Sequence, residues 1–357
     1  MDSGAGRSTV LPENVVLRCL SAAEELGIGT VYLSGGEPFL HPNFSDILSS
    51  LPELRPFSIA VSTNGTLIGT REAECLKAIN VTAQVSIDGA EEYHDTFRSM
   101  PGAFRAAARG IRELVKAGVP VVVVTTICSD NLDVLSWLSA WALDLGVSCI
   151  SVQPLQELGR ARTIVSKKLS PQQMCRLFLQ VSDLGYAYAK RGLYFRLAYR
   201  SRDHLLEHPC AAYVCNGSKC HRGVSKEIKT LIVREDGVVL PEIATLNPRY
   251  ALGNVNEASL PELIAGYFET GYAEFHELCS RVYFEVVPEY LSPIIPWNEL
   301  LSERSWTGPA PTLTLDKGCG ARLTPTPTEV VTEIVAPSRP TTLEGCPPGA
   351  PSSHALS

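Results

Sequence analysis

The sequence has no excess of positive charge, no long apolar run and no apolar stretch among its first ten residues. Its 31 Lys and Arg residues face 38 Asp and Glu, so the formal net charge is −7. No basic face dominates, and nucleic-acid binding has little support. Apolar stretches such as "VPVVVVTTI" (119–127) are too short to span a bilayer. Because the first ten residues are polar, we expect a cytoplasmic protein without a membrane partner.

Several familiar motifs are also absent. No G-x-G-x-x-G fingerprint or P-loop follows any predicted strand, and no G-x-S-x-G elbow is present, which argues against common nucleotide-binding enzymes and serine hydrolases. The eleven cysteines are odd in number and scattered, which argues against a secreted disulfide framework. We expect the isolated cysteines in apolar segments to be small core residues: Cys19, Cys75, Cys128, Cys149 and Cys175.

A regular alternation of helices and strands runs from residue 12 to about 200. Strands are predicted at 30–34, 57–63, 82–88, 119–127, 147–155 and 193–198, and helices at 12–27, 43–51, 70–79, 102–117, 131–146 and 171–191. Alternating units of this kind predict an α/β fold with a parallel sheet and right-handed crossovers. Strand 121–127 is apolar throughout, as strands covered on both faces are.

The alternation breaks at residues 204–225. A hairpin is predicted over 229–242, with Asp236-Gly237 at its turn, and a short helix near 258–266. Residues 305–357 are rich in Pro, Thr, Ser and Gly and are predicted to be disordered. The chain therefore divides into a domain at 1–200, an extension at 201–304 and a tail at 305–357.

Small and polar residues follow the predicted strands. In parallel α/β folds, ligands gather at the carboxyl ends of strands. Two glycines before an acid, as in "SGGEP", suggest a backbone that passes close to a ligand. Hydrogen-bonding side chains of these types suit a ligand with an amino group, hydroxyls and a heteroaromatic ring. The residues concerned lie at 34–38, 62–65, 86–89, 125–126 and 153–161.

This ordered set resembles the radical S-adenosylmethionine (SAM) enzymes, within the subgroup that carries a cysteine-rich C-terminal extension of the SPASM or twitch type. The resemblance covers residues 12–200 well and 210–266 loosely. It implies a partial (βα)6 TIM-like barrel with a small Cys-containing C-terminal subdomain. It also implies reductive cleavage of SAM at a [4Fe–4S] cluster and modification of a peptide or small-molecule substrate by hydrogen abstraction. The electron donor would be a protein such as flavodoxin or ferredoxin.

The resemblance also implies roles for single residues. The segment Gly35, Gly36, Glu37 and Pro38 would hold the amino group of SAM. Ser62 and Asn64 would lie by its ribose or methionine part, Ser86 and Asp88 by the ribose, Thr125 and Thr126 beside the pocket, and Gln153 on the adenine side. For Arg98 two roles stay open: it binds SAM or substrate, or it pins the linker 93–104 through an ion pair with Asp95.

The sequence departs from this family at its start. The family's core cluster needs three cysteines, usually spaced C-x3-C-x2-C, after a first strand; this sequence has neither that strand nor that motif, and Cys19 stands alone in the first helix. Two explanations stay open: the chain is truncated at its N-terminus, or it is a degenerate, non-catalytic binding partner without the core cluster. A partial barrel missing its first strand would expose an apolar edge, so we expect the chain to associate or to dissolve poorly.

A second cysteine group lies in the extension. Cys210, Cys215 and Cys220 have the spacing C-x4-C-x4-C, with His221 adjacent. They fit a metal or an auxiliary iron–sulfur site, or a loop of reduced thiols. The resemblance places a further cysteine just after the hairpin, where this sequence has Glu242; Cys279 is a candidate distant ligand, and Cys319 and Cys346 lie in the tail.

Overall fold

A six-stranded parallel sheet is the centre of the structure, a computed structural model that describes residues 10–51, 57–214 and 228–307. The strands follow one another in sequence order and are β1 (Thr30–Leu33), β2 (Ser58–Thr63), β3 (Val81–Ser86), β4 (Val121–Ile127), β5 (Cys149–Pro154) and β6 (Tyr194–Leu197). Every predicted strand is present, and the α/β class is confirmed.

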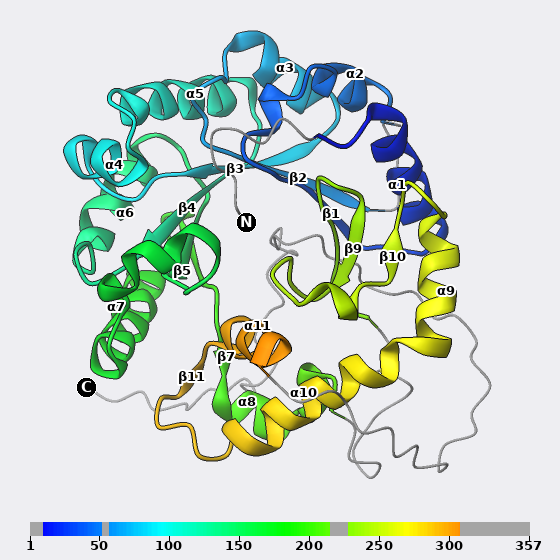
Figure 1. Ribbon diagram of the computed structural model, residues 1–357. Helices are drawn as coiled ribbons and strands as arrows, with labels where there is room; N and C mark the ends of the chain where they lie inside the picture. Colours follow the sequence, from blue (N-terminus) through cyan, green and yellow to red (C-terminus); the bar gives the residue numbers. More distant parts are fainter. Residues whose placement is uncertain (1–9, 52–56, 215–227, 308–357) are drawn as a thin grey trace, which may run out of the picture.

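Helices cover the outer face of this sheet, as Figure 1 shows. They are α1 (Glu13–Glu25), α2 (Phe44–Ser49), α3 (Thr70–Ala78), α5 (Ala103–Ala117), α6 (Val134–Asp144) and α7 (Pro171–Ala189). Each matches a predicted helix within three residues at either end. One more helix, α4 (Glu91–Arg98), lies in the connection from β3 to α5, where the sequence analysis had only a linker. Of the five cysteines expected in the core, Cys128 and Cys149 are buried and Cys175 is exposed on α7, so that expectation is wrong for Cys175.

The two faces of the sheet differ in chemistry. Side chains alternate between the faces of a strand. One set, which includes Val61, Val85 and Val152, belongs to the main apolar core under the helices. The residues between them point to the concave face and are largely polar on β3 and β5: Thr82, Gln84, Ser86, Cys149, Ser151 and Gln153.

The sheet curls so strongly that side chains of its two edge strands meet across the concave face. Tyr32 of β1 and Arg196 of β6 lie at opposite edges of the strand order. Nevertheless, the hydroxyl of Tyr32 interacts electrostatically with the guanidinium of Arg196; Tyr32 is buried and Arg196 is half-buried. The inside of the half-barrel is therefore bridged by a polar contact.

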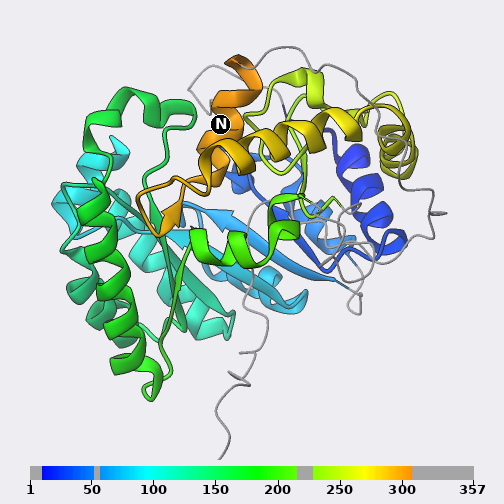
Figure 2. The same cartoon turned by 90° about the horizontal axis from the view of Figure 1, so that it is seen from below.

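The C-terminal segments occupy the open side of this half-barrel (Figures 1 and 2). They comprise β7 (Arg200–Ser201), α8 (Arg202–Glu207), β8 (Leu231–Val233), β9 (Val238–Pro241), β10 (Gly253–Asn254), α9 (Leu260–Thr270), α10 (Tyr272–Val286), β11 (Ile294–Ile295) and α11 (Trp297–Thr307). Arg18 of α1 donates to the carbonyl of Val255 over 3.0 Å, which ties this part to the N-terminal helix.

The predicted hairpin is confirmed: β8 and β9 pair antiparallel, and Gly237 takes the left-handed φ of 84° that its turn requires. The predicted helix near 258–266 is α9. Helices α10 and α11 were not predicted, and α11 reaches Thr307, three residues into the segment expected to be disordered. The rest of that tail lies outside the described residues, and the three-part division of the chain stays a prediction. Across the described ranges, no helix combines the length and apolarity needed to cross a membrane.

The contact between α5 and the loop after β2 gives a test of this packing. A Cβ atom at Gly110 would lie 2.3 Å from the carbonyl oxygen of Gly65 and 3.1 Å from Cβ of Ile68. Gly110→Ala should therefore lower the free energy of unfolding by about 1–3 kcal/mol, measured by urea denaturation. The matched control is Gly185→Ala on α7, where a Cβ meets no atom within 4 Å. Equal stability of the two variants would contradict the packing.

Candidate functional site

The loop after β1 is open to a ligand. Ser34, Gly35 and Gly36 are exposed. Neither glycine has a positive φ, so the turn itself does not demand glycine at these positions. A Cβ built on Gly35 meets no atom within 4 Å. What the missing side chain provides is therefore free space beside the backbone, which a ligand can enter.

Glu37 joins this loop to the next one. Its Oε1 accepts a hydrogen bond from the Thr63 hydroxyl (2.7 Å), and its Oε2 accepts from the amide of Asn64 (2.7 Å). It also accepts from the amide of Phe39, at the start of the short helix η1 (Pro38–Leu40). Burial raises the pKa of Glu37, and these hydrogen bonds act in the opposite direction. The acid thus fixes the loops after β1 and β2 relative to each other.

Asp88 connects the ends of β3 and β4 as Glu37 connects the loops after β1 and β2, and Asp88 has no exposed surface. Its Oδ2 lies 2.5 Å from Nε of Arg98 on α4, and its Oδ1 accepts from the amide of Thr126 over 2.9 Å. Its backbone amide donates to Nδ1 of His94 over 3.2 Å. This carboxylate therefore ties α4 and the end of β4 to the end of β3.

The alternative ion pair of Arg98 with Asp95 is wrong. Arg98 uses its guanidinium on Asp88. Asp95 instead accepts hydrogen bonds from the backbone amides of Gly102 (2.5 Å) and Phe104 (2.8 Å). The linker into α5 is therefore pinned by Asp95 through backbone amides, and the pKa of Asp95 is lowered by these bonds.

The remaining predicted residues fall into two groups. Ser62, Ser86 and Gln153 are half-buried and share the concave face. Asn64 is half-buried too, but its Oδ1 accepts from the amide and hydroxyl of Thr66, so it mainly shapes its own loop. Strand alternation turns Thr125 toward the helices, where it is fully buried. Of the two threonines, Thr126 is the one that lies with the concave polar residues.

Arg196 and Tyr32 were missed by the sequence analysis, although a lone arginine within the apolar strand "LYFRLA" was an available signal. Burial lowers the pKa of Arg196, and contacts with Tyr32 and Cys149 act in the opposite direction. This half-buried cation gives the concave face a positive centre: Arg196 is the register partner of Ser151 on β5, and Ser86 of β3 lies in the same row two strands further on.

The cysteine group of the extension is only partly described. Cys210 lies in the short helix η3 (Pro209–Ala212), and its carbonyl accepts from Nζ of Lys229. Cys215 and Cys220 lie outside the described residues. Glu242, at the place expected for a further cysteine, is buried and accepts from Arg200 and from the Tyr213 hydroxyl (2.5 Å). Among the described residues, no three His, Cys, Asp or Glu side chains are grouped to hold a metal ion.

A partial parallel barrel with an open, polar rim at its strand ends defines the class of this protein. Residues 3–133 match the sequence profile described as Radical SAM superfamily. This part of the chain is therefore similar to members of that superfamily.

Two curated relatives match part of the chain. The AdoMet-dependent heme synthase of Methanosarcina barkeri is 36% identical over 43% of this chain and 43% of its own length. The Antilisterial bacteriocin subtilosin biosynthesis protein AlbA of Bacillus subtilis is 31% identical over 41% of this chain and 33% of its own. The chain therefore spans less than half of each of these relatives.

Solved structures share the fold over a longer range. The crystal structure of Streptococcus suis SuiB bound to S-adenosylmethionine has a TM-score of 0.59 at 18% identity, covering 75% of this chain and 61% of that one. A structure of SuiB bound to the precursor peptide SuiA also gives 0.59, at 17% identity, covering 77% of this chain and 62% of that one. At such identities the likeness shows the fold alone.

The residues of the rim fit SAM, but the described residues do not fit a [4Fe–4S] cluster. The open backbone at Gly35 and the polar side chains of Ser62, Ser86 and Gln153 suit the amino group, hydroxyls and adenine of SAM. A [4Fe–4S] cluster needs thiolate ligands. The part of the chain that the structure describes groups no such set, so it does not fit the cluster.

The buried histidine of this rim predicts a pH effect. Burial lowers the pKa of His94, so the unfolded chain binds a proton first as the pH falls. Stability should therefore decline from about pH 7 to pH 5, by at most about 1.4 kcal/mol per pH unit for this one group. His94→Asn keeps an acceptor for the Asp88 amide and should flatten the decline, measured by urea denaturation at each pH. His204→Asn on the exposed face of α8 is the control; an unchanged slope in His94→Asn would contradict the assignment.

Proposed function

We propose that this chain binds SAM on the concave rim of its sheet, as part of a radical SAM-type enzyme that modifies an organic substrate. The observation that carries the proposal is the free space at Gly35, next to a carboxylate-braced pair of loops. In this assignment Gly35, Gly36, Glu37 and Pro38 shape the amino-group end of the site. Ser62, Ser86, Thr126 and Gln153 offer hydrogen bonds to the rest of the cofactor.

Each part of this site has a separate task. The exposed backbone of Ser34, Gly35 and Gly36 offers carbonyl oxygens to an ammonium group. Because the carboxylate of Glu37 is already engaged by the next loop, we assign it the positioning of that backbone rather than the main contact to the ammonium. Asp88 positions Thr126 in the same way, through the amide of that residue.

Two lines support a peptide as the substrate. AlbA is described as a bacteriocin biosynthesis protein, and SuiB has been solved with a precursor peptide. The reductive cleavage of SAM and hydrogen abstraction that the family resemblance implies depend on a cluster that would supply the electron. The described residues do not provide the ligands of that cluster, and we assign none of those steps to them. Cys210, with Cys215 and Cys220, remains the proposed auxiliary metal site.

A second candidate is a non-catalytic binding partner that keeps the SAM site. The absence of a grouped ligand set among the described residues favours it. Formation of 5′-deoxyadenosine from SAM distinguishes the enzyme from the binding partner. After anaerobic reconstitution with iron and sulfide, the full chain is incubated with SAM and dithionite, and 5′-deoxyadenosine is measured by mass spectrometry. Formation of this product supports the enzyme, whereas SAM binding without it supports the binding partner.

Gly35→Ala tests the SAM site itself. The methyl group enters space that no protein atom occupies, so the free energy of unfolding should be unchanged while SAM loses room. We expect affinity for SAM, measured by isothermal titration calorimetry on the full chain, to fall by at least about tenfold, or roughly 1.4 kcal/mol. Gly185→Ala, with equal free space on α7, should bind like the wild type. Unchanged affinity in Gly35→Ala would place SAM elsewhere.

A further inference from the structure

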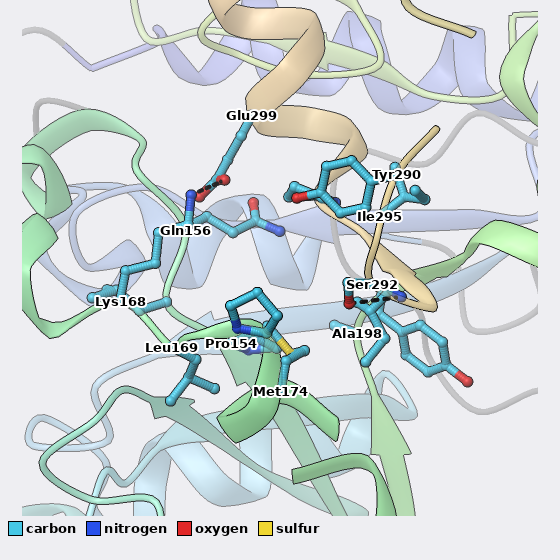
Figure 3. Close-up of a pocket in the computed structure, with 15 residues that line it drawn as sticks. Pro154, Gln156, Lys168, Leu169, Met174, Ala198, Tyr290, Ser292, Ile295 and Glu299 are labelled. Atoms are coloured by element: carbon cyan, nitrogen blue, oxygen red, sulfur yellow. Dashed lines mark hydrogen bonds and ion pairs between the residues drawn. The ribbon is translucent and has the colours of Figure 1, made fainter. Parts of the chain in front are cut away.

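A cavity of about 260 Å³ adjoins the rim at the carboxyl ends of β5 and β6. Its wall on the barrel side begins at Pro154, directly after Gln153, and continues through Leu155 and Gln156 (Figure 3). Its opposite wall comes from the segment 290–296 and from Glu299 of α11. The cavity therefore lies between the half-barrel and the C-terminal segments, next to the residues assigned to SAM.

This opposite wall is fastened to the barrel at two places. Nζ of Lys168 lies 2.5 Å from Oε2 of Glu299, and the amide of Glu157 donates to Oε1 of the same carboxylate. On the other side, β11 pairs antiparallel with β7, which follows β6 directly. The cavity is thus formed by the fold before any ligand enters, so a ligand does not have to order its walls.

The residues that line the cavity disfavour a charged ligand group. Figure 3 shows Pro154, Leu169 and Met174 on one side and Tyr290 and Ile295 on the other, around a common space. The two charged residues of the lining, Lys168 and Glu299, neutralise each other. A charged ligand group would lose its hydration here without gaining a free partner, whereas an apolar group gains contact with the walls.

Apolar surface continues outward from the cavity. Tyr199 lines it and is 37% exposed, and its ring packs edge-on against Phe178 of α7, with 5.9 Å between the centroids. Leu291, beside the lining residues Tyr290 and Ser292, is 96% exposed. A molecule that fills the cavity with one group can therefore lie with its flanking parts along this surface, as an extended peptide would.

We infer that this cavity is the specificity pocket for one neutral, apolar side chain of the peptide substrate, walled by Met174 and Leu169 and closed by the Lys168–Glu299 ion pair. The inference rests on the proposed function for the identity of the ligand as a peptide. The volume of about 260 Å³ lies near the lower end of the range for small-ligand pockets, so it has room for a side chain as large as that of phenylalanine. The pocket would lie beside the SAM site and select which residue of the peptide is held next to SAM.

The test uses the full chain with N-acetyl-phenylalanine amide, N-acetyl-aspartate amide and the pentapeptide Gly-Gly-Phe-Gly-Gly as probes, observed by saturation-transfer difference NMR. We expect saturable binding of the phenylalanine amide, at least fivefold weaker binding of the aspartate amide, and pentapeptide binding at least as tight as that of the phenylalanine amide. Met174→Trp, which fills the cavity from α7, should weaken the phenylalanine amide at least fivefold. Ala198→Phe, which fills it from the residue after β6, should do the same if Met174→Trp fails to fold.

Leu179→Trp is the matched control, because Leu179 lies on α7, is exposed and does not line the cavity. Wild-type binding in this control, with loss in Met174→Trp, supports the pocket. No saturable binding to the wild type, equal binding of the aspartate amide, or weaker binding of the pentapeptide overturns it. SAM affinity is measured on the same wild-type sample: normal SAM binding without binding of the phenylalanine amide is a failure of the pocket alone, and binding of the phenylalanine amide without SAM binding is a failure of the proposed function.

Discussion

The rim of the sheet depends on the burial of two carboxylates. Asp88 has no exposed surface and binds Arg98 from α4 and a backbone amide from β4, while Glu37 binds the hydroxyl and amide that follow β2. Removing one partner from a buried pair leaves a charge without compensation, which is strongly destabilising. The loops after the first four strands therefore hold their places through these two acids, and the open backbone at Gly35 inherits its position from them.

The sequence was sufficient for the order of the elements because the signals were local. Glycines with left-handed φ follow helices α5 and α6, and the strand between these helices, β4, is short and rich in valine. It was not sufficient for the partner of Arg98, since Asp95 precedes it within α4 and Asp88 lies before that helix, and only the packing of α4 decides between them. The orientation of Thr125 and Thr126 depended on strand register, where a shift of one residue exchanges the two faces.

The C-terminal part shows the same limit. Helices α10 and α11 escaped prediction because they are held by segments distant in sequence, as when the ring of Phe275 packs against Tyr213 and Ser305 Oγ accepts from the amide of Asn247. Glu242 takes a left-handed φ of 63°, which a residue with a side chain rarely adopts. Its buried contacts with Arg200 and Tyr213 hold it there. Nothing in the local sequence announces that these three residues meet, because 42 positions separate Arg200 from Glu242.

The contact between Tyr32 and Arg196 links the two edge strands of the half-barrel across its concave face. Because the two side chains belong to opposite edge strands, widening the sheet would separate the half-buried guanidinium of Arg196 from the hydroxyl of Tyr32 with which it interacts. The contact therefore opposes widening of the concave face, whatever binds at the strand ends. A ligand that reaches from the strand ends into this face would meet the polar side chains of Ser151 and Arg196 there.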